Sequence, residues 1–414
     1  MACFLLVINY RKLNIMEVFI MKYNFDKKVD RIKNNSAKWD EMGKNFGCNE
    51  LLPMWIADMD FETAPEILEE MKNKLDQKIF GYVSRPDSYY QSAIDWTKKR
   101  YSYDIDLSTI IHSPGVIPTI SIILKYFTKD TDKIMIQTPV YPPFAGTVKN
   151  SDKILVENEL VQDTDRNWHI DFEDFEAKAK DKDLKWFILC NPHNPVGRVW
   201  KREELQKMAD ICLKHNVRVI ADEIWRDLVY KGHEFIAFSS LSKEVEDMTI
   251  TCFSATKTFN MAGLQASFAV FPRKEELSLF DTKLAALDIR RNNPFSLVAM
   301  EAAFNKGEAW LCELLEYLEG NVDLVMKYVN ENIPEIKIKK PEGTYLVWLD
   351  FRELNLSSEE ISKALIEEGK VALNGGSSFG NVGSGFFRMN IACSRYMVQD
   401  ALERINKAVK YINK

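Results

Sequence analysis

Lys257 lies in the stretch SATKTFNMAGLQAS, residues 254–267, which directly follows a short β-branched run at 249–253. In open parallel α/β sheets, ligands bind where strands end and loops gather. A lysine at such a place is desolvated enough to lose its proton and form a Schiff base. Most lysines in loops are simply solvated, so Lys257 becomes a catalytic candidate only through the motifs that accompany it.

Two further polar residues follow apolar runs in the same way. Asp222 lies in ADEIW, residues 221–225, and a carboxylate there can keep a neighbouring ring nitrogen protonated. Asn194 lies in CNPHNPVG, residues 190–197, where two prolines and a glycine predict an unusual loop and the amide can donate to a phenolate oxygen. Taken alone, the Asp222 motif is more often a polar turn at a strand end, and the Asn194 motif would be an unremarkable turn.

A fourth motif, HSPGVIPTISIILKYF at 112–127, reads as a small-residue turn that leads into an apolar helix. The free backbone amides and positive dipole of such a helix start form a phosphate site, here through Gly115, Val116 and Ile117. A simple buried helix fits the motif equally well. The four motifs together, in this order, supply what pyridoxal 5'-phosphate requires, and we predict that cofactor with Lys257 as its covalent anchor.

The elements that must position these residues follow from the periodicity. Runs rich in β-branched residues alternate with helical patterns, which is typical of parallel βαβ units buried on both faces. The predicted strands are 133–137, 153–156, 186–190, 218–221, 249–253 and 268–271, and an amphipathic helix is predicted over 203–216. Beyond about 304 one long helical pattern runs to 332, followed by strands at 336–339 and 345–350 and helices from 357 and 398.

We therefore expect residues 73–304 to form a large cofactor-binding domain and residues 305–414 a smaller α+β domain. Residues 24–72 would form the N-terminal part of the small domain. Residues 1–23 are predicted to be an N-terminal extension, of which the first twenty lack the basic start and cleavage site of a signal peptide.

Composition narrows the function classes. The net charge is −6 and the basic and acidic residues are mixed along the chain, so we expect no nucleic-acid partner. The chain lacks a run of about eighteen apolar residues, so we expect no membrane partner. The seven cysteines are scattered without a Cys-x-x-Cys pair, which predicts reduced thiols, no metal site and a cytoplasmic location.

From about residue 24 to its C-terminus the chain resembles fold-type I pyridoxal-phosphate enzymes. Within the class I/II aminotransferase family it is most similar to the MalY/PatB group of carbon–sulfur β-lyases. The resemblance implies an α/β fold with a mostly parallel seven-stranded central sheet in the large domain, a smaller α+β domain, and a homodimer with a shared active site. The motifs that carry it are GYVSRPD, SPGVIP, TPVYPPF, ILCNPHNPVGRVW, ADEIWRDL, SATKTFNMAGLQAS and FFRMNIACS.

The resemblance also implies roles for single residues. Lys257 would hold the cofactor and move protons, and Tyr141 would stack on its ring. Tyr82 would reach from the neighbouring subunit towards the phosphate, beside Ser254. Arg388 would bind the substrate α-carboxylate, and Asn194 would contribute to both the cofactor and the substrate site.

Two positions depart from the wider family. Gln265 stands where many aminotransferases carry an arginine, which agrees with the β-lyase group. Trp225 stands where aminotransferases usually carry tyrosine and many β-lyases histidine, and its indole N–H can only donate to the cofactor.

The expected reaction is the α,β-elimination of an S-substituted L-cysteine, with cystathionine favoured, to pyruvate, ammonia and a thiol. That chemistry belongs to cysteine and methionine metabolism. An aminotransferase uses the same lysine and ring and is the main alternative. A regulatory protein that acts through a protein partner is an alternative of another class, and no sequence feature identifies such a partner surface.

Overall fold

The computed structural model describes residues 22–414. Its centre is a seven-stranded sheet in the order β2-β10-β9-β8-β7-β3-β4, in which β10 runs antiparallel to both neighbours and the other pairs are parallel. The strands are β2 (Ile110–Ser113), β3 (Lys133–Thr138), β4 (Ile154–Glu159), β7 (Leu184–Cys190), β8 (Arg218–Asp222), β9 (Thr249–Phe253) and β10 (Ser267–Val270).

Helices cover both faces of this sheet, because successive strand residues point to opposite sides and both sides are apolar. One face packs Ile136 and Ile220 against α6 (Val116–Tyr126), α7 (Pro143–Asn150) and α11 (Lys274–Ala286). The other face packs Phe187 and Val219 against α8 (Phe172–Ala179), α9 (Arg202–His215) and α10 (Lys243–Met248). The loops at the strand ends therefore carry the polar chemistry.

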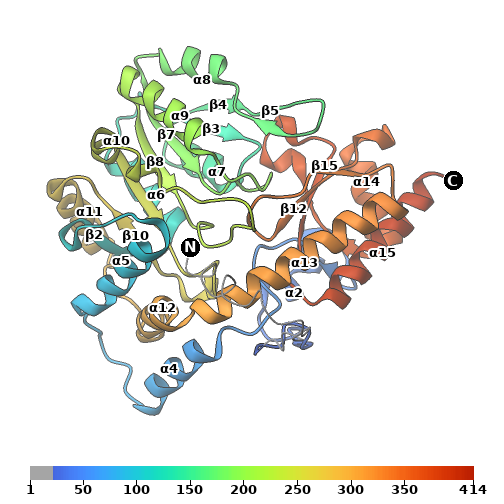
Figure 1. The fold of residues 1–414 in the computed structure, drawn as a ribbon, viewed down its shortest axis with the longest axis horizontal. Helices are drawn as coiled ribbons and strands as arrows, with labels where there is room; N and C mark the ends of the chain where they lie inside the picture. The colour runs from blue at the N-terminus through green and yellow to red at the C-terminus, as the bar shows by residue number, and fades with distance from the viewer. Residues whose placement is uncertain (1–21) are drawn as a thin grey trace, which may run out of the picture.

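A second, antiparallel sheet has the order β11-β12-β15-β14 and lies on the other side of the molecule, among the orange and red elements of Figure 1. Its strands are β11 (Lys337–Ile338), β12 (Leu346–Asp350), β14 (Asn374–Gly375) and β15 (Phe386–Asn390). The helices around it are α13 (Glu308–Asn332), α14 (Ser358–Ala364) and α15 (Arg395–Ile412).

The segment before the central sheet joins these C-terminal elements. Its strand β1 (Leu52–Pro53) pairs in parallel with β13 (Val371–Ala372), and the short helices α2 (Ala37–Asp40) and α3 (Met42–Phe46) precede it. Farther along, α4 (Pro65–Asp76) and α5 (Asp87–Tyr101) both pack on α12 (Pro294–Lys306).

The predicted fold class is confirmed, and all eight predicted strands are present with ends shifted by up to three residues. β2 was not predicted, because its four residues are too few to show a period. The predicted helix from about 304 to 332 is wrong at its start, because the helix is interrupted at Gly307. This residue is the C-cap of α12 and the N-cap of α13. A Cβ at Gly307 would lie 2.4 Å from Cε1 of Phe259.

Five of the described cysteines are free, namely Cys48, Cys190, Cys212, Cys252 and Cys393. Cys312 is disulfide-bonded, so the prediction of reduced thiols throughout is wrong at that position, since sequence spacing does not reveal which thiols meet in space. Within residues 22–414, no helix has the length and apolar character needed to cross a membrane. The predicted extension lies almost wholly outside the described residues, and the domain boundaries stay predictions.

Candidate active site

Three of the sequence motifs meet at one edge of the central sheet. Asp222 ends β8 and pairs in register with Cys190, which ends β7, and with Cys252 near the end of β9. Because these strands are parallel, the loops that carry Asn194, Asp222 and Lys257 leave the sheet side by side.

Lys257 lies in the turn after β9, and its Nζ donates a hydrogen bond to the Ala57 carbonyl oxygen at 2.6 Å. Its ammonium also lies 5.6 Å from the ring centre of Trp225. Burial lowers the pKa of Lys257 to about 8, with Arg388 acting in the same direction and Asp58 and Asp222 opposing it. A substantial neutral fraction near pH 8 is what a Schiff-base nucleophile requires.

Asp222 is 4% exposed, and its Oδ1 accepts a hydrogen bond from the Ile224 amide at 3.0 Å. Burial raises the pKa of Asp222 to about 7, although Lys257 and the amide of Ile224 favour its ionised form. No basic side chain within residues 22–414 forms an ion pair with it. A cationic group placed beside this carboxyl would therefore lower its pKa and ionise it.

Arg388 on β15 is 3% exposed and is held by two oxygen atoms. Its Nη1 donates to Asn194 Oδ1 at 3.1 Å, and its Nη2 donates to the Trp55 carbonyl at 2.9 Å. Its Nε has no partner, and no carboxylate of the described chain pairs with it. A buried guanidinium without a counter-ion is a ready site for an incoming carboxylate.

Two aromatic residues line the same region. The pKa of Tyr141 is raised, chiefly by burial. The charge of Arg388 lowers this pKa and the charge of Asp222 raises it. Trp225 is 3% exposed and packs edge to face on Tyr345, with ring centres 4.8 Å apart. Neither the indole N–H of Trp225 nor the NH₂ group of Asn194 has an acceptor among residues 22–414, so both remain able to donate.

The predicted phosphate segment begins α6. Gly115 is the N-cap residue with φ 150°, and no side chain caps the helix. The amides of the first turn, including those of Val116 and Ile117, have no intrahelical acceptor. Ser254 is 1% exposed, and its hydroxyl donates to the Ala266 carbonyl at 2.6 Å, which orders the turn that carries Lys257.

Tyr82 does not enter this site within one chain. It is 92% exposed in the segment between α4 and α5, where the guanidinium of Arg291 lies 5.3 Å from its ring centre. Gln265 is also exposed, at the end of a short 3-10 turn.

Sequence reasoning missed three contributors. The carbonyls of Trp55 and Ala57 bind Arg388 and Lys257, and the hydroxyl of Tyr345 donates to the Ala57 carbonyl at 3.0 Å. A backbone carbonyl leaves no signature in residue type. The stretch PMWIADMDF, residues 53–61, offered the one available signal. Its apolar residues follow neither the helical period of 3.6 nor the strand period of 2, which indicates an irregular segment.

The donor set fits pyridoxal phosphate. The buried carboxyl of Asp222, which has no cationic partner, matches the ring nitrogen, and the unused N–H donors of Asn194 and Trp225 match the ring oxygen. The buried guanidinium of Arg388, which has no anionic partner, matches the substrate carboxylate. The uncapped start of α6 matches the phosphate. Asp222, Asn194, Trp225 and the start of α6 would hold the cofactor, which Lys257 would bind covalently.

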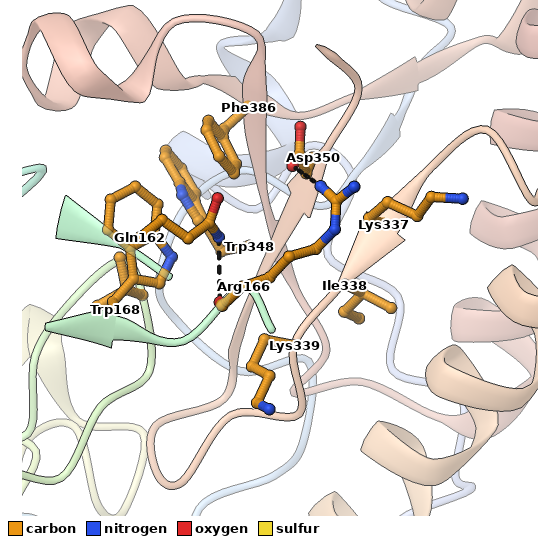
Figure 2. A pocket seen from close by; sticks show the side chains of 10 residues that line it. Gln162, Arg166, Trp168, Lys337, Ile338, Lys339, Trp348, Asp350 and Phe386 are labelled. Carbon is orange, nitrogen blue, oxygen red and sulfur yellow. Dashed lines mark hydrogen bonds and ion pairs between the residues drawn. The ribbon is translucent and has the colours of Figure 1, made fainter. Parts of the chain in front are cut away.

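The cavity in Figure 2 lies elsewhere, between the hairpin β5 (Val161–Gln162) and β6 (Trp168–His169) and strands β11, β12 and β15. Its volume of about 10 Å³ has room for one water molecule. Arg166 crosses it to pair with Asp350 at 2.6 Å, as Figure 2 shows. None of the predicted site residues lines this cavity, and we assign it no catalytic part.

Comparison with known proteins gives a consistent result. Residues 50–405 match the family model of aminotransferase class I and II. Cystathionine beta-lyase PatB of Bacillus subtilis (strain 168) is 41% identical over 387 residues, which cover 93% of this chain and all of the relative.

Solved structures agree with the sequence match. A PLP-bound candidate aminotransferase from Clostridium difficile 630 superposes with a TM-score of 0.92 at 53% identity, covering 94% of this chain and all of that one. The PLP-bound C–S lyase from Staphylococcus hominis superposes with a TM-score of 0.88 at 32% identity, covering 94% of this chain and 99% of that one.

Proposed function

The chain belongs to the aminotransferase class I and II family, and we propose that within it the protein is a cystathionine β-lyase. It is a pyridoxal-phosphate-dependent enzyme of the C–S lyase group, as the sequence predicted. The observation that carries the choice of reaction is the 41% identity to a cystathionine beta-lyase along 93% of this chain.

The bound cofactor supplies an electron sink that makes the α-proton of an amino acid acidic. Lys257 is the group that removes this proton, because its pKa of about 8 leaves part of the amine neutral at cellular pH. Asp222 supplies the negative charge at the end of β8 that stabilises a cationic ring nitrogen.

Arg388 orients the substrate. Its unpaired Nε and the remaining N–H groups of Nη1 and Nη2 provide donors for the α-carboxylate, while Asn194 and Trp55 keep the guanidinium in one plane. Elimination requires the carbon–sulfur bond to stand perpendicular to the cofactor ring, and a fixed carboxylate limits the rotations available to the substrate.

Aminotransferase activity remains the rival reaction, since Lys257 and Asp222 would serve it equally well. The absence of an arginine at Gln265 favours the lyase assignment through the family resemblance. A regulatory role through a protein partner has no supporting observation among the described residues.

We also propose that the active unit is a homodimer in the cytoplasm. The exposed position of Tyr82 supports the first part, because a tyrosine in that family segment acts on the neighbouring subunit's cofactor. Five described cysteines are free, which supports the second part, whereas the disulfide bond of Cys312 counts against it.

The test uses the purified holoenzyme with L-cystathionine and no keto acid. We expect pyruvate, ammonia and homocysteine in equal amounts, with one water consumed per turnover. Lys257→Ala is the control and should fold, yet form no product and no covalent adduct after borohydride reduction. If turnover instead requires a keto acid and releases a new amino acid with the thioether intact, the protein is an aminotransferase.

A further inference from the structure

A cluster of four charged side chains, two of them buried and two partly buried, lies outside the site described above. Lys38 on α2 is 0% exposed, and its Nζ lies 2.5 Å from Asp60 Oδ2 and 3.7 Å from Asp58 Oδ1. Arg31 completes the cluster, with Nη2 2.8 Å from Asp58 Oδ2 and Nη1 2.8 Å from Asp60 Oδ1. We call these four residues the ion cluster.

The ion cluster holds the backbone of the segment 55–59. Arg31 Nη1 donates to the Met59 carbonyl at 3.0 Å, and Lys38 Nζ lies 3.3 Å from the Asp58 carbonyl. The indole N–H of Trp55 donates in return to the Lys38 carbonyl at 3.0 Å. One end of the segment is therefore tied to α2, and the other end is tied to both α2 and Arg31.

The same segment binds the two groups on which the reaction depends. The Ala57 carbonyl accepts from Lys257, and two residues earlier the Trp55 carbonyl accepts from Arg388. On the other side, Asn390 Nδ2 donates to the carbonyls of Ile56 and Asp58, each at 2.6 Å. The segment thus links the amine that moves the proton to the guanidinium that holds the carboxylate.

We propose that Lys38 and Asp60 are positioning residues, which set the separation of Lys257 and Arg388 through the segment 55–59. This inference rests on the proposed function. The alternative is that the ion cluster only attaches the N-terminal segment to the protein. A buried ion pair adds little net stability compared with apolar residues of the same volume, so anchoring alone is a weak reason to bury Lys38 and Asp60.

The ion cluster also acts on Lys257 through charge. The charged groups that face Lys257 are Asp58 from this segment, Asp222 from β8 and Arg388 from β15, and the hydroxyl of Tyr345 shares its acceptor. Neutralising Asp60 leaves Arg31 and Lys38 with Asp58 as their single carboxylate, so the ion cluster gains net positive charge and Asp58 offsets less of the positive potential at Lys257.

The test compares Asp60→Asn with Glu62→Gln in the cofactor-loaded protein. Glu62 is a matched control, because it lies two residues away and pairs with Lys27 at 2.5 Å while both side chains are more than half exposed. Two properties are measured: the pH at which the visible absorbance of the bound cofactor changes, and the binding of L-alanine, which has no β leaving group, without keto acid.

In Asp60→Asn we expect the absorbance transition to move to lower pH and the dissociation constant for L-alanine to rise about tenfold, as loss of one charged hydrogen bond implies. Glu62→Gln should match the parent in both. The absorbance transition is measured without any substrate and does not depend on whether elimination or transamination follows, so it stays valid if the lyase assay fails.

Trp39→Phe is a second variant, which removes only the 2.8 Å indole hydrogen bond to Asp60 Oδ1. It should show smaller shifts in the same directions, and it decides the question if Asp60→Asn does not fold. Folded variants with a lower melting temperature but parental absorbance transition and alanine binding would overturn the proposal, because the ion cluster would then act as an anchor alone.

Discussion

At the scale of single residues, Asp222 offers the clearest contrast with its neighbour Glu223. Burial raises the pKa of both carboxyls to about 7. Glu223 accepts a hydrogen bond from the Phe238 amide at 2.9 Å, whereas Asp222 points to the edge where Lys257 lies. We therefore expect these two buried acids, with similar pKa values, to have different tasks.

We predict that Asp222→Asn binds the cofactor but loses activity on the order of 10²-fold or more in kcat, because an amide cannot stabilise a cationic ring nitrogen. The visible spectrum measures cofactor occupancy, and pyruvate release measures kcat. Glu223→Gln is the matched control and should retain activity within a few fold. Near-parental turnover of Asp222→Asn would assign the ring-nitrogen partner to another residue.

Local motifs reveal some site residues and not others. Lys257, Asp222 and Asn194 are recognisable because each follows an apolar strand within a few positions. Trp55 and Ala57 are not, since they act through carbonyl oxygens on partners 333 and 200 positions away, respectively. No periodicity records such contacts, which appear only when the segment before the sheet folds back onto β15.

At the scale of elements, β2 couples the sheet edge to α5 through a histidine. His112 is 1% exposed, and its Nδ1 lies 3.1 Å from the Tyr89 hydroxyl and 3.1 Å from Asn292 Nδ2. Burial lowers the pKa of His112 to about 3, and the charge of Arg85 acts in the same direction.

This shift predicts a loss of stability in mild acid. Between pH 6.5 and 3 the unfolded chain binds a proton at His112 and the folded chain does not, so the free energy of unfolding falls by up to about 1.4 kcal/mol per pH unit. Denaturant unfolding at pH 7 and pH 5 measures the slope.

His112→Gln should reduce that slope and leave part of it, because burial also lowers the pKa of His193, to about 4. An unchanged slope in His112→Gln would contradict the assignment.

At the scale of the whole molecule, α4 and the chain after it extend away from the central sheet, at the lower edge of Figure 1. This region exposes large apolar side chains, with Ile79 at 74%, Phe80 at 54% and Leu75 at 54%. A cluster of this kind on an extended arm is typical of an interface.

We predict that the protein sediments as a dimer of two 48.0 kDa chains. Ile79→Ser combined with Phe80→Ser should shift it towards monomer and lower activity, because Tyr82 would lose its neighbouring site. Tyr396 on α15 is 77% exposed in another region, so Tyr396→Ser is the control. A double variant that remains dimeric in analytical ultracentrifugation would place the interface elsewhere.

The unpaired guanidinium of Arg388 has a consequence for the time course of the reaction. Pyruvate carries the same carboxylate as the substrate, so product that accumulates competes for the same donors. The reaction rate should therefore fall earlier in the time course than substrate depletion alone explains. Enzymatic removal of pyruvate should restore the initial rate. Acetate and formate buffers present the same group, so steady-state constants measured in them will depend on buffer concentration.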